Sequence, residues 1–368
     1  YICYENNNSS VVKQGKKTKI VLVGYRLANG GLERVLSTVS DLLHYSNCEV
    51  HVIVLENEVE YPVHGTLIKL GHYSKFQKYF KLRSYLKRNQ FDYVIDFRHR
   101  INPWMELLFI HYMYAGFKFI YTIHSSKLDV YLTAEKWVAQ KILNKAYKIV
   151  AVSNALNEKI KTKYYFEKGV VIPNSIAAKT IEIEYAAELF FKYCIAVGRL
   201  VKLKQFDKLI DTYCTSDLPK RGIHLVILGK GEEKERLEKQ IDGLQMSKFI
   251  HLLGFKNNVF SYVTNAKFLV LTSKYEGFSM VILEALFAGT PVVSFDCETG
   301  PGELVQNEHN GLLVKNQDFK ALQDAIERMV DDSQLYYLCK ENAKTSVSSF
   351  SNEKISKKWL DLVKNNTN

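Results

Sequence analysis

The chain has 368 residues, of which 47% are hydrophobic and 24% are charged, which excludes a disordered or fibrous protein and leaves room for two domains. The formal net charge is +11. All of this excess lies in the first half, because residues 1–175 hold 25 Lys and Arg against 14 Asp and Glu (25 − 14 = +11), whereas residues 176–368 hold 25 of each. A uniformly basic protein that binds nucleic acid would not need this asymmetry. We therefore expect no nucleic acid partner and one domain that faces anions.

The sequence contains no run of 18 or more apolar residues that would suit a membrane span. The nearest candidate, residues 104–123, contains Glu106, His111 and Lys118 and is predicted to be a buried helix followed by a strand. The first ten residues turn polar after the fourth and do not resemble a signal peptide. The cysteines form no CxxC pair, which predicts reduced thiols in a cytoplasmic protein and no metal site. They are Cys3, Cys48, Cys194, Cys214, Cys297 and Cys339.

The first half of the chain is predicted to alternate strands with helices. Residues 19–25, KIVLVGY, form a short apolar run rich in β-branched residues, which is typical of a buried parallel strand. A helix pattern follows over 32–43. Further strands are predicted at 50–55, 93–97, 119–123, 149–152 and 170–172. This alternation indicates a doubly wound α/β sheet.

A second series of strands is predicted in the other half, with helices such as 232–242 and 319–330 between them. These strands are 194–197, 224–228, 250–252, 268–271 and 291–295. Residues 174–190 carry no strand, so the N-terminal domain is predicted over 1–178 and the C-terminal domain over 190–350. The last segment, 352–368, is helical by pattern, and we expect it to pack back on the N-terminal domain. The predicted fold class is therefore α/β, with two Rossmann-like doubly wound domains.

The most informative segment is YEGFSMVILEALFAGTP, residues 275–291. Its Gly-Phe-Ser step is predicted to form the turn between the strand at 268–271 and a helix that ends at Gly289. The free backbone N–H groups at the start of that helix are a candidate phosphate site. Glu276 lies beside this site and Glu284 lies two turns further on. The candidate binding residues are Glu276, Gly277, Phe278, Ser279, Met280, Val281 and Glu284.

Two carboxylates that bracket a phosphate site suit a sugar nucleotide. A carboxylate accepts hydrogen bonds from paired hydroxyls, which a ribose and a hexose both offer, and the diphosphate of a sugar nucleotide lies between these two polyols. The alternative is a purely structural role, in which the helix is capped and one buried glutamate accepts a hydrogen bond from a backbone donor.

Two further segments supply groups that suit a diphosphate. In AVGRLVKLKQ, Arg199 follows a predicted strand and Lys204 comes five residues later. Arginine can bind a phosphate bidentately and lysine acts as a point charge, although each alone is equally a surface cation. In LANGGLERV, Gly30 and Gly31 let the backbone approach a ligand at the start of the first helix.

In this order, the segments resemble the retaining glycosyltransferases of family 4 (glycosyl transferases group 1). The E-x7-E pair followed by AGTPVV is the most specific element, and the GRL-x3-K element and the early GG loop fit the expected order. The resemblance covers nearly the whole chain and implies the GT-B fold, in which two Rossmann-like domains face a central cleft. One departure is Gln205, where the family usually has glycine.

The resemblance also implies residue roles. Glu276 would contact the donor sugar and Glu284 the ribose, while Arg199 and Lys204 grip the diphosphate. The loop with Gly30 and Gly31 would face the diphosphate from the other domain. Phe255, Lys256 and Asn257 would lie at the base, and His124, in TIHSS, would be the active-site histidine near the sugar, although a lone histidine after a strand is more often structural. The predicted catalytic residues are therefore Glu276, His124, Arg199 and Lys204.

The resemblance implies a UDP-sugar as donor, carrying a hexose or an N-acetylhexosamine, with no cofactor and no metal. No carboxylate is placed as a nucleophile. The expected retaining route is therefore front-face, with the leaving diphosphate helping to take the acceptor proton. The protein then contributes positioning and stabilisation of charge on that diphosphate. Residues 297–305, CETGPGELV, resemble a loop of transferases that build bacterial cell-surface glycans.

Residues 69–100 hold nine Lys and Arg against Asp92 and Asp96. A helical pattern within them is predicted to place four apolar side chains on one face among cations, as in a helix that rests on an anionic membrane surface. These side chains are Phe76, Tyr79, Phe80 and Leu86. An ordinary Rossmann helix with solvated lysines fits the pattern equally well.

Because the charge excess is confined to the N-terminal domain, we favour membrane contact on the cytoplasmic face and a lipid-linked or surface-polysaccharide acceptor. Arg98, His99 and Arg100 are candidates to meet its phosphate. The competing function is a catalytically silent GT-B subunit that binds glycan or stabilises a partner. Such a subunit tends to lose the two acids and the two cations, whereas this chain keeps all four.

Overall fold

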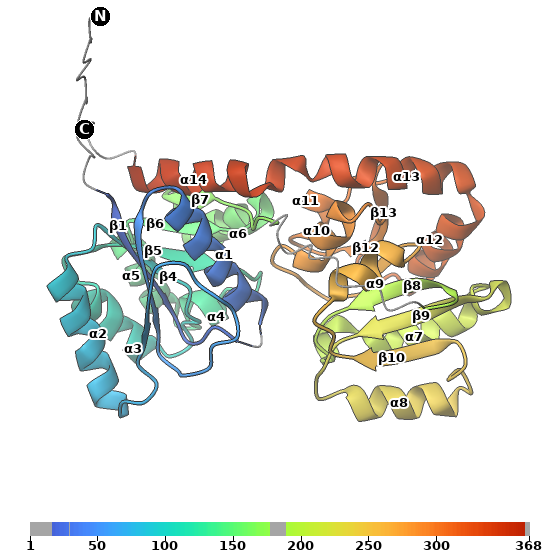
Figure 1. The fold of residues 1–368 in the computed structure, drawn as a ribbon, viewed down its shortest axis with the longest axis horizontal. Coiled ribbons are helices and arrows are strands. Elements are labelled where there is room, and N and C mark those ends of the chain that lie inside the picture. Colours follow the sequence, from blue (N-terminus) through green and yellow to red (C-terminus); the bar gives the residue numbers. More distant parts are fainter. Residues whose placement is uncertain (1–16, 29, 177–188, 365–368) are drawn as a thin grey trace, which may run out of the picture.

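The computed structural model describes residues 17–28, 30–176 and 189–364. Cys3, residues 365–368 and most of the segment 174–190, for which no strand is predicted, lie outside these ranges. Two α/β domains stand side by side, and the last two helices run along one side of both (Figure 1). This architecture confirms the predicted fold class.

The N-terminal domain is built on a parallel sheet with the strand order β3-β2-β1-β4-β5-β6-β7. All of its strands except β3 are predicted from the sequence. The four residues of β3 are partly or wholly exposed, so they form no apolar run. The strands are β1 (Lys19–Gly24), β2 (Glu49–Val54), β3 (Thr66–Lys69), β4 (Tyr93–Asp96), β5 (Lys118–Ile123), β6 (Lys148–Ala151) and β7 (Gly169–Val171).

Helices connect these strands. The first of them buries Val35, Leu36, Val39, Leu42 and Leu43, whose three- and four-residue spacing gives one apolar face against the sheet. The helical elements are α1 (Gly31–Tyr45), α2 (Lys75–Asn89), α3 (Pro103–Leu108), the π-helical turn η1 (Phe109–Met113), α4 (Asp129–Leu132), α5 (Lys136–Lys145) and α6 (Asn154–Tyr164).

The C-terminal domain holds a second parallel sheet, with the order β10-β9-β8-β11-β12-β13. Its strands are β8 (Lys192–Val197), β9 (Ile223–Leu228), β10 (Ile250–Gly254), β11 (Leu269–Leu271), β12 (Val292–Asp296) and β13 (Gly311–Lys315), of which β13 is not predicted. Its helical elements are η3 (Lys202–Lys204), α7 (Phe206–Thr215), η4 (Pro219–Arg221), α8 (Lys234–Gly243), α9 (Val259–Asn265), α10 (Met280–Phe287), α11 (Pro301–Leu304), α12 (Phe319–Asp331), α13 (Ser333–Ser346) and η5 (Ser348–Phe350).

The last helix, α14 (Asn352–Lys364), returns to the N-terminal domain (Figure 1). Its Ile355 and Trp359 are buried in the same apolar cluster as Val39 and Leu42 of α1. The hydroxyl groups of Ser46 and Ser356 also lie 2.6 Å apart. The chain therefore crosses to the C-terminal domain and comes back, which ties the two domains together at a second point.

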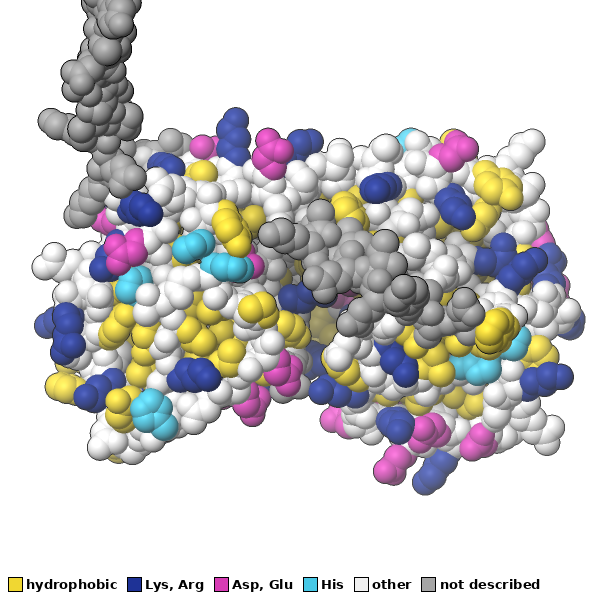
Figure 2. All heavy atoms as spheres, in the orientation of Figure 1, with side chains coloured by type: hydrophobic (Ala, Val, Ile, Leu, Met, Phe, Trp, Pro, Cys, Tyr) yellow, Lys and Arg dark blue, Asp and Glu magenta, His cyan; other side chains and the backbone are white. Residues whose placement is uncertain are grey.

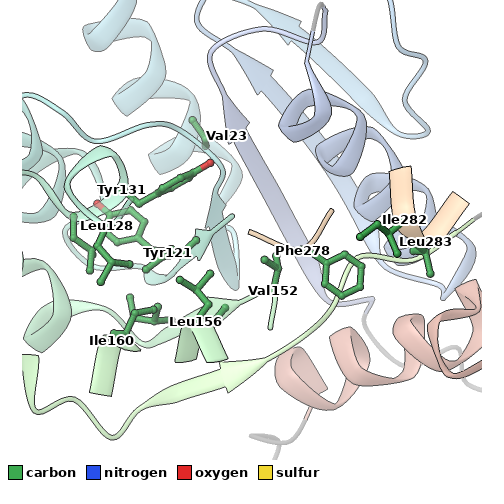
Figure 3. Close-up of a cluster of buried hydrophobic side chains, with 14 of the residues drawn as sticks. Val23, Tyr121, Leu128, Tyr131, Val152, Leu156, Ile160, Phe278, Ile282 and Leu283 are labelled. Carbon is green, nitrogen blue, oxygen red and sulfur yellow. The ribbon is translucent and has the colours of Figure 1, made fainter. Parts of the chain in front are cut away.

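A single cluster of buried apolar side chains continues from one domain into the other. Figure 3 shows the ring of Phe278 between Val152, which follows β6, and Ile282 of α10. Phe278 of the Gly-Phe-Ser turn therefore takes part in the packed contact between the domains.

The face of α2 that meets the core differs from the predicted one. Leu82 and Leu86 are fully buried, Tyr79 is half-buried, and Phe76 and Phe80 are 87% and 68% exposed. At about 100° per residue, Leu86 lies about 80° around the helix from Phe76, ten positions earlier, and about 120° from Phe80. Leu86 thus belongs to the core, and the prediction that it shares a face with the phenylalanines is wrong.

The segment at 104–123 forms α3, η1 and β5, a helical part followed by a strand as predicted. Only one side of the helical part is buried, with Phe109, Ile110 and Met113 enclosed. Trp104 is 73% exposed and Tyr112 is 48% exposed. In the described ranges, no helix is both long and apolar enough to cross a membrane. The described cysteines are all free thiols.

The N-terminal domain contains a buried cluster of charges at the end of β4. Arg98 is enclosed and donates hydrogen bonds to Asp96 at 2.7 Å and to Glu106 at 3.1 Å. Arg100 is equally buried and donates to backbone carbonyl oxygens, including that of Asp96 at 2.6 Å. Neither guanidinium is accessible, so the prediction that these arginines meet an acceptor phosphate is wrong. Their charges hold the loop after β4 in place instead.

Replacing Arg98 should destabilise this domain strongly. Arg98→Met removes the only arginine whose side chain bonds both buried acids in the described cluster, and breaking a buried pair in this way costs about 3–5 kcal/mol. Urea unfolding measures the loss. Arg88→Met, on the exposed side of α2, is the matched control and should change stability by no more than about 0.5 kcal/mol. Equal stability of the two variants would contradict this account.

Candidate active site

A cleft of about 640 Å³ lies between the two domains. Segments that follow β1, β4, β5, β8 and β11 line it. The strand order reverses between β1 and β4 in one sheet and between β8 and β11 in the other. Ligands of open α/β sheets bind at such switch points, beyond the carboxyl ends of the strands. Here both switch points open onto one cleft, and Figure 2 shows acidic and basic side chains at the boundary of the domains.

All of the predicted site residues line this cleft or the pocket of about 540 Å³ that adjoins it. The cleft is lined by Gly30, Gly31, His124, Arg199, Lys204, Glu276, Gly277, Phe278, Ser279, Met280, Val281 and Glu284. The adjoining pocket is lined by Lys256 and Asn257, and by Gly30, Gly31 and Arg199 again. The exposed ring of Phe255 borders the same pocket, 5.0 Å from the ammonium group of Lys230. Residues from five separate segments of the sequence thus meet in one place.

The turn that carries Glu276 is held against the opposite domain. Gly277 has no room for a side chain, because a Cβ atom there would collide with the backbone carbonyl of His124. Ser279 adopts a left-handed conformation (φ 65°), and α10 begins at the next residue. Its hydroxyl oxygen is buried without a hydrogen-bond partner among the described residues. The first backbone N–H groups of α10 therefore start at the wall of the cleft, where a helix N-terminus favours an anion.

Glu276 is paired with Lys204. The ammonium nitrogen and a carboxylate oxygen lie 2.6 Å apart, and the side chains are only 18% and 12% exposed. Gln205, which stands next to Lys204 in place of the usual glycine, adopts a left-handed backbone (φ 52°). Its side-chain oxygen accepts a hydrogen bond from Gln317 at 2.9 Å. The turn thus keeps the left-handed shape that glycine would favour. A non-glycine residue in this conformation costs about 1 kcal/mol of stability.

Glu284 is paired with Arg34, a residue that the sequence did not point to. The two side chains form an ion pair of 2.6 Å between α1 of the N-terminal domain and α10 of the C-terminal domain. Arg34 follows the GG loop by one helical turn, which is the signal that could have suggested it. Both acids of the E-x7-E pair therefore hold a cation, and one of these cations comes from the opposite domain.

Arg199 extends into the cleft from the segment after β8 and is exposed. Within the described ranges, it makes no ion pair shorter than 4 Å. Across from it, the carboxylate of Glu33 lies against Gly30. Burial raises the pKa of Glu33, and the charges of Arg26 and Arg199 oppose this shift. Arg199 is thus a cation that a ligand can reach without first displacing a carboxylate.

His124 follows β5 and lines the cleft, but both of its ring nitrogens are buried and have no hydrogen-bond partner among the described residues. Its ring stacks on Phe97, with ring centroids 5.6 Å apart. Burial, together with the nearby charges of Arg100 and His99, lowers the pKa of His124 to about 3. The imidazole is therefore neutral at physiological pH and can offer a hydrogen bond but no positive charge.

No group of three or more His, Cys, Asp or Glu side chains within the described ranges is arranged to hold a metal ion.

Two facing Rossmann-like domains with a charged cleft at both switch points define the GT-B class of glycosyltransferases. Residues 29–179 match the family model described as Glycosyltransferase Family 4, and residues 184–346 match the one described as Glycosyl transferases group 1. The chain belongs to this family 4 type of glycosyltransferase, as the motifs predict.

Its relatives include bacterial enzymes of cell-envelope glycans. The chain is 27% identical to an N-acetylgalactosamine-N,N'-diacetylbacillosaminyl-diphospho-undecaprenol 4-alpha-N-acetylgalactosaminyltransferase of Campylobacter jejuni, over 94% of this chain and 99% of that one. It is 25% identical to the amylovoran biosynthesis glycosyltransferase AmsD of Erwinia amylovora, again over 94% and 99%. The crystal structure of Anabaena HepE in complex with UDP and glucose has the same fold, with a TM-score of 0.79 at 18% identity over 94% of this chain and 99% of that one.

The lowered pKa of His124 makes stability depend on pH. Because the folded state resists protonation of this ring, its contribution is fully present above the unfolded pKa of 6.5 and is lost as pH falls towards about 3. Between pH 6.5 and 5.5, this one group should remove about 1 kcal/mol. Urea unfolding at the two pH values should therefore show a smaller loss in His124→Asn than in the wild type.

The same change at the exposed His309 is the control for this experiment. An identical pH dependence in His124→Asn and the wild type would mean that His124 titrates alike in the folded and unfolded chain.

Proposed function

We propose that this protein is a retaining glycosyltransferase that moves a hexose or an N-acetylhexosamine from a UDP-sugar to a lipid-linked or surface-polysaccharide acceptor in bacterial cell-envelope synthesis. The observation that carries the proposal is the arrangement at α10. Glu276 precedes the helix N-terminus and Glu284 lies within the helix, and each is paired with a cation in the cleft between the domains. The relatives named above act on envelope glycans, which supports this choice of acceptor.

In the proposed complex, the diphosphate lies between Arg199 and the N-terminus of α10. Glu276 accepts hydrogen bonds from hydroxyls of the donor sugar, and Glu284 accepts them from the ribose. The base occupies the adjoining pocket beside Lys256 and Asn257. Donor binding would then exchange partners at both acids, because Lys204 and Arg34 already neutralise them. The displaced ammonium of Lys204 stays close enough to contact the diphosphate.

The proposed chemistry relies on charge stabilisation and positioning. As the bond from the anomeric carbon to the diphosphate breaks, negative charge grows on the departing phosphate and positive charge grows on the sugar. Arg199, Lys204 and the amide dipoles of α10 would stabilise the phosphate. The acceptor hydroxyl would attack from the same face and pass its proton to the departing phosphate, which retains the configuration. The neutral ring of His124 would serve as a hydrogen-bonding group rather than as an acid.

Removing either partner of the Glu276–Lys204 pair should abolish transfer. Glu276→Ala loses the hydrogen bonds to the donor sugar, and Lys204→Ala loses charge stabilisation, so kcat/KM should fall by at least about 10²-fold in each. The rate is measured with a panel of sugar nucleotides and an undecaprenyl-diphosphate glycan. Lys202→Ala, an exposed lysine of the same η3 turn, is the control and should keep wild-type activity.

Wild-type transfer by Glu276→Ala or Lys204→Ala would contradict this site assignment, provided that circular dichroism shows the fold to be intact. The anomeric configuration of the product, determined by NMR, tests the retaining route, and inversion would exclude it. Binding of UDP without transfer to any acceptor would favour the silent GT-B subunit instead.

We also propose that the protein rests on the cytoplasmic face of the plasma membrane through residues 69–100. The supporting surface is the exposed side of α2, where Phe76 and Phe80 point to solvent near Lys75 and Lys87. This helix lies at the edge of the N-terminal domain that is far from the C-terminal domain (Figure 1). Aromatic side chains among lysines suit the headgroup region of an anionic bilayer.

The exposed aromatic surface continues beyond α2. The guanidinium of Arg83 lies 5.5 Å from the ring of Tyr112 in η1, and Trp104 of α3 lies 6.3 Å from Trp137 of α5, centroid to centroid. Of these aromatic residues, Trp104 is 73% exposed, and Tyr112 and Trp137 are each 48% exposed. Several elements of the charged domain thus present aromatic rings to solvent.

Phe76→Ser with Phe80→Ser should weaken binding to vesicles that contain phosphatidylglycerol. The double change removes the apolar part of the contact but leaves the lysines, so sedimentation with vesicles should drop while the remaining binding still fades with salt. Phe190→Ser, a 92% exposed phenylalanine of the other domain, is the control. Unchanged sedimentation of the double variant, or binding that does not depend on salt, would remove the peripheral-membrane proposal.

A further inference from the structure

Glu303 connects the two domains through hydrogen bonds to a helix N-terminus. It lies on α11 of the C-terminal domain, and its carboxylate accepts from the backbone N–H of Asn154 at 3.0 Å and of Ala155 at 2.9 Å. The side-chain amide of Asn154 donates to it as well, at 3.1 Å. These groups open α6 of the N-terminal domain, where Ser153 already caps the N–H of Leu156. An acid from one domain thus completes the cap of a helix in the other.

The segment that carries Glu303 also supports the turn with Glu276. The hydroxyl of Thr299 donates a hydrogen bond to the backbone carbonyl of Glu276. Gly300 has a positive φ of 96° and packs tightly beneath this turn, because a Cβ atom there would lie 3.2 Å from Cα of Phe278 and 3.3 Å from Cβ of Glu276. The five residues from Thr299 to Glu303 therefore contact the Glu276 turn at one end and the N-terminal domain at the other end.

These contacts close a ring through both domains. The Glu276 turn meets the N-terminal domain at Gly277, which packs against the carbonyl of His124. Its other side rests on Thr299, whose segment returns to the N-terminal domain through Glu303. The Glu276 turn is thus held between two contacts with the same domain, and neither contact involves the acid's own side chain.

We propose that Glu303 is a positioning residue, which holds the turn of Glu276 against His124 by anchoring residues 299–303 to the N-terminus of α6. The inference rests on the proposed function for its effect on transfer, but its structural part does not. A carboxylate suits the role because both of its oxygens accept, whereas glutamine would turn its amide group towards one of the N–H donors of Asn154 and Ala155. Loss of the anchor leaves the side chain of Glu276 unaltered but allows its backbone to move.

Hydrogen exchange of the full-length, ligand-free protein tests the structural part. In Glu303→Gln, backbone amides should exchange faster in two places: at 154–158, where the cap is lost, and at 276–281, where the turn loosens. Thr299→Val cuts the same connection at the other end and should affect 276–281 alone. Glu298→Gln is the matched control, because it breaks a neighbouring ion pair between the domains, Lys159–Glu298 at 2.6 Å, and should leave 276–281 unchanged.

Faster exchange confined to 154–158 in Glu303→Gln would make Glu303 a plain helix cap and would overturn the inference. If Glu303→Gln unfolds the protein, Glu303→Asp and Thr299→Val provide the same comparison. Absence of any transfer by the wild type would refute the proposed function. The hydrogen-exchange result would still decide whether Glu303 anchors the Glu276 turn.

The transfer assay tests the positioning role. In Glu303→Gln, kcat should fall about tenfold or more, because a small displacement of a reacting group is costly. The KM for the sugar nucleotide should stay within about twofold, because Glu284 and the adjoining pocket still hold the nucleotide. Wild-type kcat in Glu303→Gln, or a loss confined to KM, would overturn the inference. Glu298→Gln should keep both constants.

Discussion

The rest of the site depends on the close approach of Gly277 to the backbone of His124. No other amino acid fits there, because a Cβ atom would enter the carbonyl oxygen. Phe278, the next residue, is buried in the apolar cluster that continues from one domain to the other. Together, the two residues fix Glu276 relative to the N-terminal domain. The groups on both sides of the cleft therefore have a defined separation, although they belong to separately built sheets.

Charge inside the cleft is balanced by the protein itself. A half-buried carboxylate is costly unless a cation or donor accompanies it. Lys204 supplies this charge to Glu276 from the same domain, and Arg34 supplies it to Glu284 from the opposite one. Arg199, which also lines the cleft, is exposed and accessible to an anion. The proposed binding of the donor and the contact between the domains thus use the same few side chains.

Much of this arrangement can be predicted from local sequence. Buried parallel strands produce continuous apolar runs, so β1 and its neighbours are clear, and the E-x7-E spacing marks the helix at the site. The short strand β3 escapes prediction because its residues are partly exposed. The Arg34–Glu284 pair and the anchor at Glu303 join residues 250 and 149 positions apart, and no local pattern encodes such contacts. The prediction that Arg98 is accessible is wrong for another reason. The sequence shows that a cation is present, but it cannot distinguish a solvated arginine from one that is enclosed by acidic side chains.

The ion pairs inside the cleft have a consequence for the end of the proposed catalytic cycle. If the nucleotide binds Glu276 and Glu284 as proposed, Lys204 and Arg34 are close enough to take its place when it leaves. The two carboxylates, whose side chains are only 12% and 14% exposed, are then not left without a cation. Because the Arg34–Glu284 pair joins the two domains, its re-formation would also restore this contact between them. The free energy of re-forming both ion pairs would offset part of the binding free energy lost when the product dissociates.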